Sequence, residues 1–219
     1  EALQRSLNLP AVDLLDQLTP QRFASQLAAG GLKLRIATAE QANLSLILDG
    51  ARSGKSSYAQ TFAEATGKSV TFIATAQALD EEMSARIQKH RAERPGTWGT
   101  LEIPLEIASH VQQVKSDVVI LDCITLLVNN LLMQFVKDDL VDEAPFMQAV
   151  QKEINELVAK ISEQKQTWMI ISNEVGLGLV PPYQMGRVYR DGLGWANQRL
   201  AREADKVIFM VAGIPTVIK

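Results

Sequence analysis

The sequence has few of the features that mark secreted, membrane or nucleic-acid-binding proteins. A single cysteine, Cys123, among 219 residues excludes a disulfide framework and indicates a reducing compartment. No apolar run approaches the roughly 20 residues that span a bilayer, and no signal-peptide pattern opens the chain. The net charge of −3 argues against a broad basic face for nucleic acid. We therefore expect a cytoplasmic protein with no membrane span and no nucleic acid as partner.

The composition is that of a globular protein with room for one large domain. Hydrophobic residues make up 47% of the chain and charged residues 21%. The length of 219 residues suffices for one α/β domain and an extension. Residues 1–42 hold helical fragments and gather no cluster that resembles a site. The sequence thus predicts an N-terminal extension of unknown role over 1–42 and a main domain over 43–219.

Short apolar runs alternate with amphipathic segments along the main domain. The runs predict strands at Leu44–Leu48, Val70–Ala74, Val118–Leu121, Trp168–Ser172 and Val207–Val211. Apolar residues three and four apart predict helices near 55–66, 80–93, 104–115, 124–136, 145–165 and 187–204. Apolar strands that alternate with helices indicate an α/β fold, with a mainly parallel sheet and helices on both faces.

One apolar run leads directly into a glycine-bearing loop. Residues 46–56 read Leu-Ile-Leu-Asp-Gly-Ala-Arg-Ser-Gly-Lys-Ser, with a strand expected before the loop and a helix after it. The backbone N–H groups of such a loop bind phosphates at a helix N-terminus. Lys55 would reach the β- and γ-phosphates, and the Ser56 hydroxyl would bind Mg²⁺. The alternative interpretation is a chance Gly-Lys-Ser turn before a helix.

The loop departs from the full phosphate-binding pattern at Asp49. That pattern has glycine five residues before the Gly-Lys pair, which is the place of Asp49 here, and Gly50 follows to supply the turn. A carboxylate near phosphates repels them unless it points away or pairs with a cation. Nucleotide affinity is therefore the property on which Asp49 bears most directly.

A second motif is the apolar run Val118–Leu121 that ends at Asp122. In a P-loop protein this is the shape of the strand beside the phosphate loop, whose terminal carboxylate supports Mg²⁺. Any buried strand can end in Asp, so the motif gains meaning only together with Lys55 and Ser56. The three side chains predict a site for metal and phosphate. Cys123, which follows, is most simply a small core residue.

A third feature is the charged segment 80–95, which predicts a helix with acidic residues at its start and basic residues at its end. Met83, Ile87 and His90 share one face of this helix. Composition leaves two interpretations open. One is a surface helix whose charges complement the helix dipole, and the other is a cationic strip that binds phosphates, formed by Arg86, His90, Arg91 and Arg94.

Further short motifs follow one another along the main domain. With the phosphate loop Gly50–Ser56, they are Ile73–Ala76, Arg86–Ile87, His90, Arg94–Pro95, Trp98, Thr100, Glu102, Leu121–Thr125, Asn129–Leu132, Ser172–Gly176, Gly178, Val180–Pro181, Arg190–Asp191, Gly194, Asn197–Gln198, Leu200–Ala201, Ala204–Asp205 and Gly213–Pro215. In this order they resemble the bifunctional adenosylcobinamide kinase / adenosylcobinamide-phosphate guanylyltransferase family of cobalamin biosynthesis. The resemblance runs from about residue 44 to the C-terminal lysine, and departs at Asp49, where the family has glycine.

The resemblance implies two reactions on one substrate. The hydroxyl of the aminopropanol arm of adenosylcobinamide is first phosphorylated by GTP or ATP. GMP from GTP is then attached to that phosphate through a guanylylated histidine, which gives adenosylcobinamide-GDP and pyrophosphate. The histidine of the family pattern falls on His90, and a neutral imidazole is a reasonable nucleophile at phosphorus. The resemblance further implies a RecA-like P-loop fold and a homo-oligomer, commonly a trimer.

The resemblance also implies which residues carry these reactions. Lys55 and His90 would be catalytic, and Ser56 and Asp122 would hold Mg²⁺. GTP and ATP would be substrates, with adenosylcobinamide and its phosphate as the other partners. The remaining nucleotide contacts would be Gly50, Ala51, Arg52, Ser53, Gly54, Ala74, Thr75, Ala76, Arg91, Ala92, Glu93, Arg94 and Glu102.

Two other functions stay open at this point. Asp49 favours a P-loop kinase or NTPase with a single activity, and residues 1–42 favour a non-catalytic GTP-binding regulatory protein.

Two segments are likewise open to more than one interpretation. Asn173–Gly178 follows a predicted strand and fits either a pocket lining or a plain turn. The region 187–202 fits either a core helix with exposed charges or a segment of subunit contacts.

Overall fold

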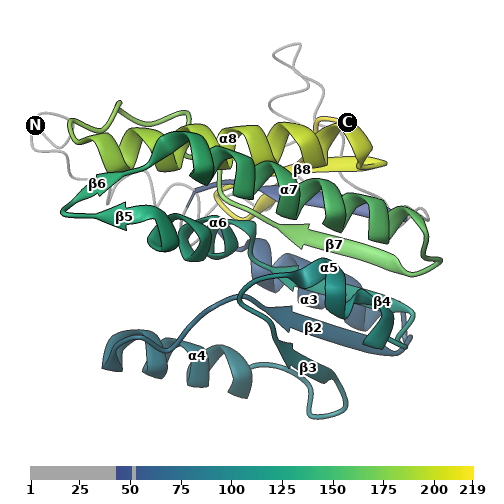
Figure 1. Cartoon of the computed structure of the whole chain (residues 1–219). Coiled ribbons are helices and arrows are strands. Elements are labelled where there is room, and N and C mark those ends of the chain that lie inside the picture. The colour runs from purple at the N-terminus through teal and green to yellow at the C-terminus, as the bar shows by residue number, and fades with distance from the viewer. Residues whose placement is uncertain (1–42, 51–52) are drawn as a thin grey trace, which may run out of the picture. The chain divides into compact units, whose positions relative to one another are not determined.

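The computed structural model describes residues 43–50 and 53–219, and the extension expected over 1–42 lies outside the described residues. A seven-stranded sheet runs through this part of the chain in the order β3-β2-β4-β7-β1-β8-β9 (Figure 1). Its strands are β1 (Leu44–Leu48), β2 (Val70–Ala74), β3 (Gly99–Glu102), β4 (Val118–Asp122), β7 (Thr167–Ile171), β8 (Lys206–Val211) and β9 (Ile214–Val217). All neighbouring strands pair in parallel except β8 and β9, which are antiparallel.

Helices lie on both faces of the sheet because its central strands are apolar on both sides. One face packs against α6, α7 and α8, whereas α3 lies against the other (Figure 1). Along β1, Leu46 belongs to the core under α6–α8 and Ile47 is buried on the opposite face. The helices are α3 (Lys55–Ala65), α4 (Glu81–Ala92), α5 (Ile107–His110), α6 (Ile124–Leu132), α7 (Glu143–Ser162) and α8 (Gln184–Glu203). The predicted α/β fold with a mainly parallel sheet is confirmed.

The predicted elements differ from the observed ones where the chain is exposed or interrupted. The helix expected at 104–115 is only the short α5, followed by a 3-10 turn at Val111–Gln113. The helix expected at 124–136 ends at Leu132, and a 3-10 turn (Met133–Phe135) leads into the small hairpin of β5 (Val136–Lys137) and β6 (Leu140–Val141). The strands β3 and β9 are absent from the sequence prediction. Neither is a continuous apolar run, and neither contains a buried residue in the structure.

The strand that ends in Asp122 is not the direct neighbour of the strand that precedes the phosphate loop. The sheet order places β7 between β1 and β4. The predicted position of Asp122 beside the loop nevertheless holds, because its carboxylate accepts a hydrogen bond from Ser56. The carboxyl end of β4 reaches the loop, because the parallel strands all end at the same edge of the sheet.

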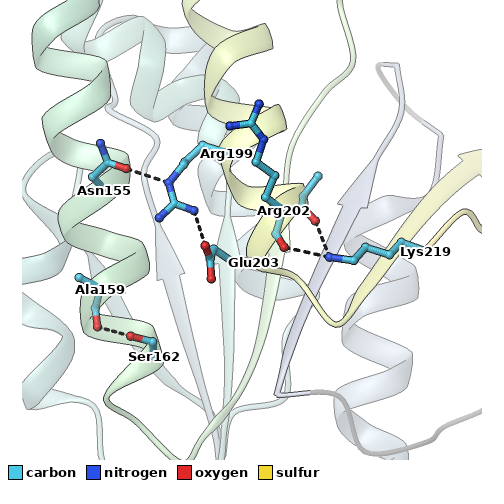
Figure 2. Close-up of polar contacts among 8 residues, drawn as sticks. Asn155, Ala159, Ser162, Arg199, Arg202, Glu203 and Lys219 are labelled. Carbon is cyan, nitrogen blue, oxygen red and sulfur yellow. Dashed lines mark hydrogen bonds and ion pairs between the residues drawn. The ribbon is translucent and has the colours of Figure 1, made fainter.

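Polar contacts fix the C-terminal half of α8 to its neighbours (Figure 2). The Arg199 side chain donates from Nε to Oδ1 of Asn155 on α7 at 2.8 Å, and from Nη1 to Glu203 at 2.7 Å. The ammonium of Lys219 donates to the carbonyls of Ala201 and Arg202 at 3.0 and 2.9 Å. These bonds hold the end of α8 against α7 and the C-terminal segment.

Across residues 43–50 and 53–219, no helix has the length and hydrophobicity that crossing a membrane requires.

Candidate functional site

A cavity of about 600 Å³ opens at the carboxyl ends of the parallel strands. In an open α/β sheet this edge is where ligands bind. The cavity contains most of the side chains that the sequence singled out. Those that line it are Ser53, Gly54, Lys55, Ser56, Ala74, Ala76, His90, Arg91, Arg94, Glu102 and Asp122, together with Arg86.

Other predicted contacts have different places. Ala51 and Arg52 lie outside the described residues. The residues Gly50, Thr75, Ala92 and Glu93 do not line the cavity.

The phosphate loop is closed by the Lys55 side chain. The Lys55 ammonium donates to the carbonyls of Asp49 and Gly50 and, at 3.2 Å, to the Ser53 hydroxyl. Burial lowers the pKa of Lys55, and the negative charge of Asp49 opposes that shift. Gly54 precedes α3 with a φ of 90°, a left-handed conformation that glycine adopts without strain. The Asp49 carboxylate thus has a cation to offset its charge.

Ser56 and Asp122 form a residue pair that could hold a metal ion. The Ser56 hydroxyl donates to Oδ2 of Asp122 at 2.8 Å, which brings an alcohol and a carboxylate to one point beside the loop. Oxygen ligands of this kind suit Mg²⁺, which binds proteins through one or two such groups and completes its shell with phosphates and water. In the part of the chain that the structure describes, no three His, Cys, Asp or Glu side chains gather as a metal cage. The donor set fits Mg²⁺ that arrives with a nucleotide.

Thr75 supports the site from behind, although it was predicted as a nucleotide contact. Its fully buried hydroxyl donates to the Cys123 carbonyl at 2.7 Å and accepts from the Cys123 amide at 2.8 Å. Its own amide donates to the carbonyl of Asp122 at 3.1 Å. The hydroxyl of Thr75 therefore fixes the backbone that carries the Asp122 carboxylate. Burial raises the pKa of the Cys123 thiol to about 12, in keeping with a core residue.

Asn130 is a site-supporting residue to which sequence reasoning gave no role. Its buried amide on α6 donates to the carbonyl of Thr75 at 2.8 Å and to that of Pro104 at 3.0 Å. It thereby joins the ends of β2 and β3, which carry two walls of the cavity. The available signal was the Asn129–Asn130 pair within the mainly apolar run 124–132.

Arg94 is a cation of the cavity whose guanidinium is held against an aromatic ring. Its guanidinium lies over the Phe72 ring, 3.5 Å from the centroid. Its Nε is buried and has no hydrogen-bond partner. Burial lowers the pKa of Arg94, whereas the nearby Asp122 charge raises it. A guanidinium held flat, with donors to spare, is suited to bind phosphate oxygens.

His90 lies on α4 and faces the cavity together with Arg86 and Arg91. Its Nδ1 is 3.9 Å from the Glu93 carboxylate, and 39% of its side chain is exposed. Arg91 is 3.6 Å from Glu102 across the cavity wall. Helix α4 contains no buried residue. The segment is therefore a surface helix, and its Arg86, His90 and Arg91 line the same cavity as the phosphate loop. Phosphate binding by these residues stays a prediction.

The Asn173–Gly178 segment lines cavities at its start and contains a turn at 176–177. Asn173 lines the first cavity, whereas Glu174 and Gly176 line a second one. The Asn173 amide donates to the Thr125 hydroxyl at 2.9 Å, which fixes the segment to α6.

Comparison with known proteins gives a consistent result. The model of the cobinamide kinase / cobinamide phosphate guanyltransferase family matches residues 45–218. The bifunctional adenosylcobalamin biosynthesis protein CobP of Pseudomonas aeruginosa is 41% identical over 176 residues, 80% of this chain and 96% of that protein. Its counterpart CobU of Escherichia coli is 39% identical over 179 residues, 80% and 98% of the two chains. Among solved structures, the RadB recombinase is similar with a TM-score of 0.44 and 12% identity, over 84% of this chain and 79% of that one.

Proposed function

The chain belongs to the cobinamide kinase / cobinamide phosphate guanyltransferase family, and from this premise we propose how its residues carry out the two reactions. Its activities are those of the family, phosphorylation of cobinamide and guanylylation of cobinamide phosphate. One observation carries the assignment of residues. A single cavity brings together the phosphate loop, the Ser56–Asp122 pair and His90.

In the kinase reaction, the acceptor hydroxyl of adenosylcobinamide attacks the γ-phosphorus of GTP or ATP. The bond to the β–γ bridging oxygen breaks, the nucleoside diphosphate leaves and the hydroxyl proton is released. Lys55 and Arg94 neutralise charge on the phosphate oxygens. Ser56 and Asp122 hold Mg²⁺, which when bound neutralises charge on the β- and γ-phosphates.

In the guanylyl reaction, an imidazole nitrogen of His90 attacks the α-phosphorus of GTP. The bond to the α–β bridging oxygen breaks and pyrophosphate leaves, so that GMP is joined to His90 by a phosphorus–nitrogen bond. A phosphate oxygen of cobinamide phosphate then attacks the same phosphorus. The phosphorus–nitrogen bond breaks, which gives adenosylcobinamide-GDP and restores His90.

We assign each predicted nucleotide contact to the phosphates, the base or the ribose according to its position. The main-chain groups of Gly50–Ser56 bind the phosphates, and those of Ala74–Ala76 border the nucleotide. Glu102, at the end of β3, accepts from guanine donors or ribose hydroxyls, and Arg91 lies 3.6 Å from its carboxylate. Ala92 ends α4 and Glu93 follows as its C-cap, with the Glu93 carboxylate 3.9 Å from Nδ1 of His90.

The test is incubation with GTP labelled at the α-phosphate, with and without adenosylcobinamide. The proposal predicts label bound covalently to the protein and, with acceptor, label in adenosylcobinamide-GDP. A kinase or NTPase with a single activity gives labelled free GDP alone, and a non-catalytic GTP-binding protein gives neither. The negative charge of Asp49 opposes the lowering of the Lys55 pKa by burial, so the carboxylate has a cation nearby and is a weaker argument for the single activity.

The state of the whole protein is also proposed from the family resemblance. We infer a homo-oligomer, a trimer, that works in the cytoplasm without nucleic acid. The net charge of −3 supports the last point. Light scattering coupled to size-exclusion chromatography measures the oligomer directly, and a monomeric mass would contradict it.

A further inference from the structure

A second cavity, of about 530 Å³, adjoins the phosphate loop and takes no part in nucleotide binding as proposed above. Leu48, the last residue of β1, contributes to its lining. Glu174, which also lines it, donates from its amide to the carbonyl of Asp49 at 3.0 Å. Because Asn173 lines the first cavity, the Asn173–Glu174 segment forms a wall that the two cavities share.

The shared wall is fixed by buried hydrogen bonds. The Ser172 hydroxyl donates to Oδ1 of Asn197 at 2.7 Å, and Nδ2 of Asn197 donates to the Asn173 carbonyl at 2.9 Å. Ser172 and Asn197 are both buried. Asn197 itself lines the second cavity, so its amide joins one cavity to the wall of the other.

The lining of the second cavity combines hydrogen-bonding groups with apolar surface. Carboxylates come from Glu174 and Asp191, an amide from Gln198, and an aromatic ring from Trp195. Gly194 lies between them on α8, and a Cβ added there meets no atom within 4 Å. The cavity is therefore open at that position.

An exposed apolar loop borders this cavity. Leu177, Leu179 and Val180 are 79%, 96% and 65% exposed. The loop is tied to α8, because Arg190 donates to the Gly176 carbonyl at 2.9 Å and Arg187 donates to the carbonyls of Pro181 and Pro182 at 3.1 and 2.7 Å. Its apolar side chains are thus held in solvent beside the cavity, an arrangement that marks a binding surface.

We propose that the second cavity and the apolar loop 176–180 bind the corrin ring of the acceptor substrate. This inference rests on the proposed function, which requires a large acceptor next to the phosphate loop. A corrin ring has apolar faces and a rim of carboxamides. The carboxamide N–H groups can donate to Glu174 and Asp191, and their carbonyls can accept from Gln198. The apolar faces match Trp195 and the exposed loop, whose surface extends the site beyond the cavity.

The experiment fills the cavity from Gly194. The variants are Gly194→Ala, Gly194→Leu and, as a matched control on the same helix, Arg202→Leu at an exposed position outside the cavity. Gly194→Leu should raise the KM for adenosylcobinamide roughly tenfold or more, with Gly194→Ala intermediate and Arg202→Leu unchanged. Covalent labelling by α-labelled GTP needs no acceptor and should stay at the wild-type level in all three.

Thermal unfolding shows whether each variant folds, and Gln198→Leu, at an exposed position of the lining, replaces Gly194→Leu if that variant does not. An unchanged KM for adenosylcobinamide in the folded cavity variants would overturn the inference. This holds also if a substitution changes the oligomeric state while the KM stays the same. Failure of the wild-type protein to phosphorylate adenosylcobinamide or to take up label would overturn the proposed function. In that case the inference falls with it. A selective KM increase supports both.

Discussion

The Ser56 hydroxyl donates a 2.8 Å hydrogen bond to the Asp122 carboxylate, although the two residues are 66 positions apart. Ser56 lies in the first turn of α3, and Asp122 ends β4, two strands away from β1 in the sheet. The bond joins the phosphate loop to Asp122, the last residue of β4. We propose that a magnesium ion accompanying the nucleotide phosphates would find both an alcohol and a carboxylate as ligands at this point.

Ser56→Ala tests this pairing. Loss of the alcohol should raise the Mg²⁺ concentration needed for half-maximal kinase activity by at least roughly tenfold. Ser162→Ala is the control, because Ser162 is exposed and its hydroxyl bonds only the Ala159 carbonyl (Figure 2). A magnesium titration of both variants decides the matter. Identical midpoints in Ser56→Ala and wild type would contradict the metal role.

Lys55→Ala should remove both activities, because Lys55 is the cation that closes the phosphate loop. We expect kcat to fall roughly 100- to 1000-fold for each reaction. Lys68→Ala, at an exposed lysine after the same helix, should leave both rates unchanged. Circular dichroism should show the native helix content in both variants. If Lys55→Ala bound GTP with wild-type affinity, the assignment of the loop would be wrong.

Asp49→Gly should leave GTP binding equal or tighter. The substitution restores the residue of the phosphate-binding pattern and removes a negative charge beside the phosphates. It also removes the charge that partly offsets the burial of Lys55, so the gain is expected to be small. Isothermal titration with GTP measures it. Markedly weaker binding in the glycine variant would show that Asp49 has a positive role in holding Lys55.

The elements that could be predicted from the sequence are those whose signal is local. The strands β1 and β2 have the predicted bounds, because each is a short, mainly apolar run with polar residues on either side. Ser56 and Asp122 could be predicted as site residues from the sequence. Asp122 directly follows an apolar run, and Ser56 ends the loop that follows another. The hydrogen bond from Asn130 to Thr75 could not be predicted from the sequence, because it joins residues 55 positions apart and depends on strand order. The second cavity likewise depends on how α8 packs beside the end of β1.

Glu153→Gln should lower the free energy of unfolding by about 1–3 kcal/mol. The two carboxylate oxygens of Glu153 accept from the amides of Glu106 and Ile107 at 3.2 and 2.9 Å, so an NH₂ group would face one of those N–H groups. Glu156→Gln, at an exposed position of the same helix, should change stability by less than about 0.5 kcal/mol. Urea unfolding at neutral pH compares the two, and equal stabilities would contradict the role of Glu153.

The same site predicts a pH dependence of stability. Burial raises the pKa of Glu153 above its ordinary value of 4.5. Above pH 4.5 the folded state therefore keeps a proton that the unfolded state releases, until the pH passes the raised pKa. The contribution of Glu153 to the free energy of unfolding consequently decreases as pH rises through this window. Urea unfolding at several pH values should show this decrease in the wild type and its loss in Glu153→Gln.

The central claim is that His90 accepts GMP while the phosphate loop serves both reactions. Mass spectrometry of tryptic peptides after treatment with GTP tests it most directly, with His110→Ala as the control, because His110 is the other of the two histidines and does not line the cavity. The adduct should map to His90, be labile in acid and stable in base, and disappear in His90→Ala. That variant should still phosphorylate adenosylcobinamide, because the kinase step uses no protein nucleophile. A GMP adduct on any other residue, or normal guanylyl transfer in His90→Ala, would contradict the account.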